Sequence, residues 1–197
     1  MAKRAKPAAK RSQTTSELPK VGAGELLTLL DFVRYAVSRF TEAELVFAHG
    51  TTDPVADAAF LVCEALHLHP DQFEPFATAR VTAAEGKKIL DLIGRRVTTR
   101  KPTAYLVNKI YMRGLPFYVD ERTIVPRSFI GELLDTHFGH NENDEYDEED
   151  GSLIGDPASI RSVLDLCTGS GCLAILASRN FPNAAIDAVD ISKDAIL

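Results

Sequence analysis

Apolar residues recur with a helical period through the first half of the chain. Between residues 24 and 99 they return every three or four positions, as in the series Leu26, Leu29, Leu30, Val33, Val37 and Phe40. Capping signals predict helix starts at Thr41–Glu44, Asp53–Pro54 and Thr82–Glu85. We therefore expect a small all-helical domain over residues 24–100.

Short β-type runs replace the helical period after residue 101. Ile110–Met112 and Phe117–Val119 flank a turn signal, Arg113–Pro116. This pattern predicts a β-hairpin, which would form a linker over residues 101–126. A helix through Leu133 and Leu134 is expected to follow it.

A strand, a glycine loop, a helix and a second strand are predicted near the C-terminus. Ser162–Leu166 and Ala185–Val189 have the composition of buried strands, and the loop Thr168–Gly171 leads into a helical segment. Another helix is expected to begin after Ser192. Such a β-loop-α-β unit is typical of the beginning of a doubly wound α/β sheet.

The charge of the chain is concentrated in one segment. The 22 Lys and Arg against 28 Asp and Glu give a net charge of −6, but residues 141–150 alone hold seven acidic residues. Without them the balance is +1, so the acidity indicates a solvated acidic loop, which we place at 141–156. Residues 1–23 are basic and aperiodic and predict a disordered tail. A solvated tail is favoured over one that contacts RNA weakly.

Several protein classes are excluded by composition. No apolar run approaches the length of a membrane span, and no apolar segment follows the basic N-terminus as in a secretory signal. Cys63, Cys167 and Cys172 are too few for a disulfide framework and lack the partners of a zinc site, so no metal is expected. Reduced cysteines fit a cytoplasmic protein.

The glycine loop indicates a nucleoside-containing cofactor. Glycines let a ligand approach the backbone, a helix N-terminus offers free N–H groups, and Asp190 follows Gly169 by 21 positions, where an acid binds ribose. Gly169, Gly171 and Ala174 also match the dinucleotide fingerprint of a dehydrogenase. However, Asp165 within the first strand would repel a pyrophosphate, and its carboxylate suits a cofactor that carries positive charge and an ammonium group.

Four motifs carry a resemblance to the protein-(glutamine-N5) methyltransferases: Arg100–Leu106, Phe117–Asp120, Ile124–Ser128 and Val163–Cys172. The chain is most similar to the branch that modifies ribosomal protein L3. The sister branch, which modifies peptide chain release factors, tends to have Pro-Arg-Pro-x-Thr-Glu where this chain has Pro126–Glu132. It also tends to have Gly in place of Cys167. The resemblance spans Leu26 to the last residue and is specific from residue 100 onward.

The resemblance implies an incomplete α/β class I (Rossmann-like) methyltransferase domain over residues 127–197. The helical domain and the hairpin linker before it would help recognise the substrate, ribosomal protein L3. S-adenosyl-L-methionine would be the cofactor and would donate a methyl group to a glutamine side chain. By family motif, Asp190 would hold the ribose and Asp165 would lie near the cofactor ammonium. The loop on the methionine side would be formed by Cys167, Thr168, Gly169, Ser170 and Gly171.

The Asn-Pro-Pro-Tyr loop that binds the substrate amide in this family is absent from the sequence. We therefore assign no catalytic residue, place that loop beyond Leu197, and expect a fragment or a truncated product that is inactive alone. A release factor glutamine methyltransferase, an adenine-N6 methyltransferase of nucleic acid and a non-catalytic binding module stay open as alternatives. The nearly neutral charge outside the acidic segment argues against a nucleic-acid substrate.

Overall fold

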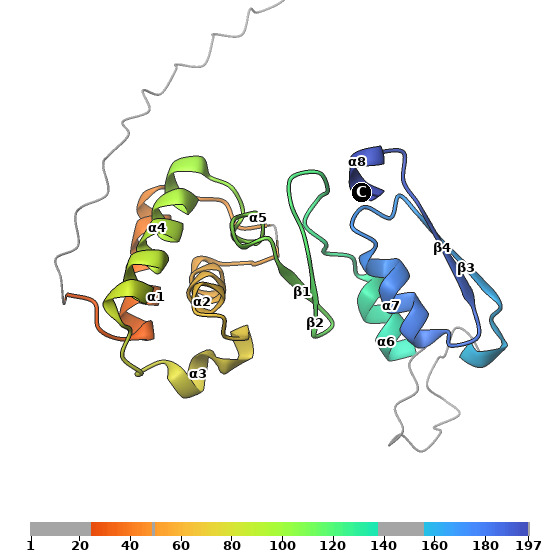
Figure 1. Ribbon diagram of the computed structural model, residues 1–197, viewed down its shortest axis with the longest axis horizontal. Helices are drawn as coiled ribbons and strands as arrows, with labels where there is room; N and C mark the ends of the chain where they lie inside the picture. The colour runs from red at the N-terminus through yellow and green to blue at the C-terminus, as the bar shows by residue number, and fades with distance from the viewer. Residues whose placement is uncertain (1–24, 49, 138–155, 197) are drawn as a thin grey trace, which may run out of the picture.

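The structure is a computed structural model that describes residues 25–48, 50–137 and 156–196. Its N-terminal part is helical, and its C-terminal part combines helices with a parallel pair of strands (Figure 1). A β-hairpin lies between the two parts (Figure 1). The predicted tail, residues 1–23, lies outside the described residues, and so does the acidic loop apart from Asp156.

The helical part follows the predicted order apart from the helix start at Thr41. Its elements are α1 (Leu29–Glu42), α2 (Pro54–Ala65), the 3₁₀ turn η1 (Pro70–Gln72), α3 (Phe73–Phe76), α4 (Ala83–Thr99) and α5 (Thr103–Val107). Asp53 and Thr82 cap α2 and α4 as predicted. The helix start predicted at Thr41 is wrong, because Thr41 lies inside the last turn of α1. The chain leaves that helix through Glu44, whose φ is 50°.

Thr28 carries the capping box of α1, whereas the capping signal at Thr41 starts no second helix. Its hydroxyl accepts the backbone N–H of Asp31 at 3.2 Å, and the Asp31 carboxylate accepts the backbone N–H of Thr28 at 2.9 Å. These two bonds satisfy N–H groups that have no partner within the helix. The predicted apolar stripe also shifts: Leu30 is exposed, whereas Phe32 and Ala36, which the stripe omitted, are buried.

The core of the helical part is formed where α1, α2 and α4 pack together. Its fully buried side chains include Phe40, Leu61, Val62, Ile89 and Ile93. Gly86 permits close packing, because a Cβ there would lie 2.9 Å from the ring of Phe32. The predicted inward positions Ile89 and Ile93 are thus confirmed.

A buried ion pair connects α2 and α4. Arg96 Nε donates to Asp57 Oδ2 at 2.9 Å, and both side chains are almost fully buried. Thr51 donates its hydroxyl to the other oxygen of Asp57 at 3.0 Å. The Arg96 guanidinium also lies 5.7 Å from the ring centroid of Phe40 and 5.6 Å from that of Phe47. Charge and hydrogen-bonding capacity are therefore matched inside the core.

The hairpin consists of β1 (Ile110–Met112) and β2 (Leu115–Phe117), which pair in antiparallel register with Ile110 opposite Phe117. The turn is tighter than predicted, since only Arg113 and Gly114 separate the strands. Both have positive φ values, 50° and 73°, which suit the right-handed twist of a two-residue hairpin. A second core joins the hairpin to the C-terminal part through buried residues that include Met112, Leu134 and Leu176.

The C-terminal part contains one parallel β-α-β unit. Its elements are α6 (Ile130–His137), the 3₁₀ turn η2 (Pro157–Ser159), β3 (Ser162–Leu166), α7 (Cys172–Asn180), β4 (Ala185–Val189) and α8 (Lys193–Ile196). Strands β3 and β4 pair from Ser162 opposite Ala185 to Leu166 opposite Val189. Within the described residues the sheets are two-stranded, so the full class I layout is not seen there. The predicted strand–loop–helix–strand order is confirmed.

Part of the parallel pair is uncovered. Helix α7 packs against β3 and β4, whereas Leu164, Leu166 and Val189 have exposed fractions of 58%, 65% and 49%. Apolar side chains of a β-sheet are usually covered by another element, so the exposure of these three is unusual.

None of the helices in the described residues combines the length and the apolar composition of a membrane span.

Candidate functional site

Residues 167–171 form a loop of unusual backbone conformation between β3 and α7. Cys167, Gly169 and Gly171 all have positive φ values, 60°, 56° and 76°. A left-handed conformation is expected for glycine and strained for cysteine. Thr168 closes the loop, because its backbone N–H donates to the carbonyl of Val189 at 3.0 Å and its own carbonyl accepts the N–H of Gly171 at 3.0 Å.

Asp165 lies in β3, and its carboxylate accepts hydrogen bonds from the loop and from α7. Its Oδ2 accepts the hydroxyl of Thr168 at 2.6 Å and the backbone N–H of Ala174 at 3.1 Å. The carboxylate therefore ties the loop to the first turn of α7, where backbone N–H groups lack partners within the helix. Its hydrogen bonds to the loop and to α7 are observed, and its expected role beside a cofactor ammonium stays a prediction.

Asp190 lies directly after β4 and reaches the same loop. Its Oδ2 accepts the backbone N–H of Gly169 at 2.9 Å, and its Oδ1 accepts that of Ser192 at 2.9 Å. The N–H groups of Ser192 and Gly169 hold the pKa of Asp190 below its ordinary value. The side chain is therefore an ionised acceptor at neutral pH, and each of its oxygens retains a lone pair for a further donor.

The two cysteines of this region lie in different environments. Cys167 is exposed, whereas Cys172 is buried at the start of α7. Burial raises the pKa of the Cys172 thiol, whose sulfur shares a 3.1 Å hydrogen bond with the Ser170 hydroxyl. In the parts of the chain that the structure describes, no group of three or more His, Cys, Asp or Glu side chains is arranged to hold a metal ion.

The glycines of the loop differ in the space around them. A Cβ placed on Gly171 would meet no atom within 4 Å, so this part of the loop borders open space. A Cβ placed on Gly169 would lie 3.9 Å from the Cβ of Thr123. The turn that contains Thr123 is thus a neighbour of the loop that sequence reasoning missed, since nothing in the local spacing relates these two positions.

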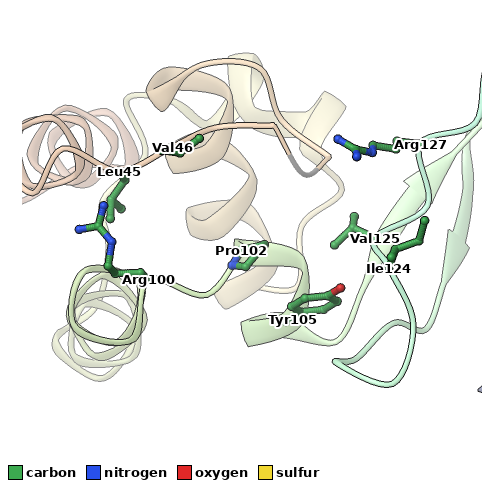
Figure 2. Close-up of a pocket in the computed structure, with 8 residues that line it drawn as sticks. All are labelled: Leu45, Val46, Arg100, Pro102, Tyr105, Ile124, Val125 and Arg127. Atoms are coloured by element: carbon green, nitrogen blue, oxygen red, sulfur yellow. The ribbon is translucent and has the colours of Figure 1, made fainter. Parts of the chain in front are cut away.

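A pocket of about 360 Å³ lies beside residues 124–127 (Figure 2). It is lined by Leu45, Val46, Arg100, Pro102, Tyr105, Ile124, Val125 and Arg127. The two arginines also bind the segment that follows α1: Arg100 donates to the carbonyls of Ala43 and Glu44 at 2.8 and 2.7 Å. Arg127 donates to the carbonyl of Ala48 at 2.7 Å. The pocket is therefore built from the helical part and from residues 124–127 together.

The predicted site residues are thus brought together around one loop. Asp165, Thr168, Gly169 and Asp190 are linked by hydrogen bonds, and Gly171 borders open space beside them. The arrangement offers an ionised acceptor, a half-buried glycine loop and a helix N-terminus to one ligand. This combination suits a ligand with hydroxyl groups.

Comparison with known proteins finds relatives that share one name. No family model matches the chain. A ribosomal protein uL3 glutamine methyltransferase from Bradyrhizobium diazoefficiens is 74% identical over 186 residues, which are 94% of this chain and 56% of that protein. Proteins of the same name from Burkholderia pseudomallei and Bordetella pertussis are 51% and 48% identical, over 86% and 87% of this chain and 51% and 54% of their own lengths.

The chain spans about half the length of the curated relatives it matches, and all three matches agree in the name of the protein. The resemblance inferred from the four motifs is thereby confirmed, including the choice of branch. By its sequence, the chain belongs to the family of the ribosomal protein uL3 glutamine methyltransferases.

Proposed function

We propose that this sequence is part of an enzyme that methylates the N5 atom of a glutamine side chain in ribosomal protein uL3. The observation that carries the proposal is the 74% identity to a uL3 glutamine methyltransferase over 94% of the chain. The arrangement of Asp190 and the glycine loop supports it, because it offers a carboxylate acceptor beside a helix N-terminus.

The cofactor in this proposal is S-adenosyl-L-methionine, held at the loop between β3 and α7. Asp190 would accept hydrogen bonds from the ribose hydroxyls, and residues 167–171 would contact the methionine portion. The open space beside Gly171 and the ionised state of Asp190 fit such a ligand. In the same proposal, residues 127–197 begin a class I methyltransferase domain, and residues 24–100 and 101–126 form a substrate-recognition domain and its linker.

The chemistry supplied by this cofactor is a methyl group on a positively charged sulfur. A glutamine side-chain nitrogen is a poor nucleophile, because its lone pair is delocalised into the carbonyl. The protein must therefore hold the amide in line with the methyl group, and no covalent intermediate with the enzyme is needed. The residues described here would fix the cofactor, and the residues that bind the amide are expected in the Asn-Pro-Pro-Tyr loop implied by family resemblance.

The function is tested with a joined protein, in which residues 1–197 are followed by the part of the Bradyrhizobium relative that the match leaves uncovered. It is incubated with S-adenosyl-L-methionine and, in parallel, with uL3, a peptide chain release factor or an adenine-containing oligonucleotide. Mass spectrometry is expected to find one added methyl group on a glutamine of uL3. Methylation of the release factor or the oligonucleotide in place of uL3 would overturn the proposed substrate, and the lack of methylation on all three would overturn the proposed activity.

A further inference from the structure

A hydrogen bond from the helical part reaches the turn beside the glycine loop. Tyr105 lies on α5, and its hydroxyl donates to the backbone carbonyl of Thr123 at 2.6 Å. Figure 2 shows this hydroxyl pointing toward the segment that carries Ile124 and Val125. At 2.6 Å the bond is short for an O–H donor, and the two residues are 18 positions apart in the sequence.

The turn that receives this bond is braced from within. The backbone N–H of Thr123 donates to the carbonyl of Asp120 at 3.2 Å. The Asp120 carboxylate accepts the backbone N–H and the Nε of Arg122 at 3.0 and 2.9 Å, and the hydroxyl of Tyr118 at 3.0 Å. These bonds connect Thr123 to Asp120 and Asp120 to Arg122, so a contact that holds Thr123 also restrains the rest of residues 120–123.

The same turn lies beside the loop 167–171. A Cβ built on Gly169 would point toward Thr123, with 3.9 Å between the two Cβ atoms. Gly169 in turn donates its backbone N–H to Asp190. Tyr105 is therefore hydrogen-bonded to a turn that lies beside Gly169, and Gly169 is hydrogen-bonded to Asp190 at the end of β4.

We propose that Tyr105 is a positioning residue for the cofactor loop: by holding the carbonyl of Thr123, it keeps the turn 120–123 in place beside Gly169. The proposal deepens the proposed function, on which its consequence for the cofactor rests. It assigns to the helical part a role in cofactor binding, in addition to the substrate recognition that the resemblance implies. Tyr105 itself is not placed in contact with the cofactor.

Tyr105→Phe removes the hydroxyl and keeps the ring. The matched control is Tyr111→Phe, which loses a comparable bond, from the Tyr111 hydroxyl to the Glu64 carboxylate at 2.9 Å, on the hairpin. Hydrogen exchange of the 197-residue chain is measured without cofactor. In Tyr105→Phe we expect exchange to become about three- to tenfold faster in residues 118–125 and also in 167–171. In Tyr111→Phe, residues 167–171 are expected to exchange as in the unmodified chain.

The proposal is overturned if Tyr105→Phe loosens residues 118–125 and leaves 167–171 unchanged, or if both variants loosen 167–171 equally. Global destabilisation is recognised from faster exchange in α1 and α4 as well, and it also counts against a positioning role.

A second measurement separates this proposal from the proposed function. The joined protein is titrated with S-adenosyl-L-methionine in a calorimeter, and Tyr105→Phe is expected to raise the Kd about three- to tenfold, with Tyr111→Phe unchanged. An unchanged Kd in Tyr105→Phe would overturn the role in cofactor binding. If no form binds the cofactor although the exchange pattern is as expected, the proposed function fails, and Tyr105 still positions the loop.

Discussion

The backbone N–H of Gly169 donates a 2.9 Å hydrogen bond to the carboxylate of Asp190. Two segments that are 21 positions apart are thereby joined at the ends of adjacent parallel strands. Because the carboxyl ends of parallel strands lie at one edge of a sheet, this edge is where an α/β protein binds its ligand. The bond thus holds the carboxylate of Asp190 beside the loop 167–171.

The first prediction concerns the protonation of Asp190. Its pKa is lowered by the N–H groups of Ser192 and Gly169, so the stabilisation from these bonds is present above the ordinary pKa of about 3.9. This stabilisation is lost as the pH falls through the lowered pKa that Asp190 has in the folded protein. We expect the amide resonance of Gly169 in NMR spectra to titrate with a midpoint below pH ~3.9. A midpoint at or above the ordinary value, or the same titration in Asp190→Asn, would contradict this assignment.

The backbone of the loop predicts opposite effects for two substitutions. Cys167→Gly relieves a left-handed conformation and is expected to raise the free energy of unfolding by up to about 1 kcal/mol. Gly171→Ala introduces such a conformation at a φ of 76° and is expected to lower it by about 1–2 kcal/mol. The added methyl group of the alanine meets no neighbour, so packing plays no part. Urea unfolding measures the free energy of unfolding of each variant. If both substitutions change it in the same direction, backbone strain is not the cause.

Thiol labelling provides a prediction about access to the loop. Cys167 is exposed, whereas Cys63 and Cys172 are buried. Burial raises the pKa of Cys63 to about 11 and also raises that of Cys172. Iodoacetamide is therefore expected to modify Cys167 first in the native chain. In the joined protein, S-adenosyl-L-methionine should slow that reaction, as measured by peptide mass spectrometry. Faster labelling of Cys172 than of Cys167 would contradict the loop geometry.

The ion pair between Asp57 and Arg96 predicts a strong effect on stability. Asp57→Ala leaves a buried guanidinium without its carboxylate, which is expected to lower the free energy of unfolding by about 3–5 kcal/mol. Glu121→Ala is the control, because it removes the partner of Lys101 in an exposed ion pair. The control should change stability by less than about 1 kcal/mol. Similar losses in free energy of unfolding for the two variants, measured with urea, would show that the buried pair stabilises the fold no more than the exposed pair.

Features set by neighbouring residues were predictable from the sequence. The caps at Asp53 and Thr82 depend on residues two or three positions away, and the strand–loop–helix–strand order follows from local patterns. The Thr41 capping signal was misleading for a related reason. Its spacing is correct, but the helix that began at Thr28 continues through it and places Phe40 in the core.

Contacts between distant segments were not predictable. Asp57 and Arg96 are 39 positions apart, and no periodicity in either helix indicates that two charged residues meet in the core. Helix α5 is only five residues long, which is too short for an apolar period to be read. The position of Tyr105, and hence its bond to Thr123, depends on that helix. The loop residues of the site could therefore be found from sequence, and the turn beside them could not.

The central claim, that the loop and Asp190 hold the cofactor, is tested most directly by calorimetric titration of the joined protein with S-adenosyl-L-methionine. Asp190→Ala removes the acceptor expected to bind ribose, whereas Asp187→Ala removes an exposed carboxylate in β4 and is the control. We predict saturable binding to the unmodified protein, a Kd raised about tenfold or more in Asp190→Ala, and no change in Asp187→Ala. Absence of binding, or equal affinity of the Asp190→Ala variant, would contradict the account.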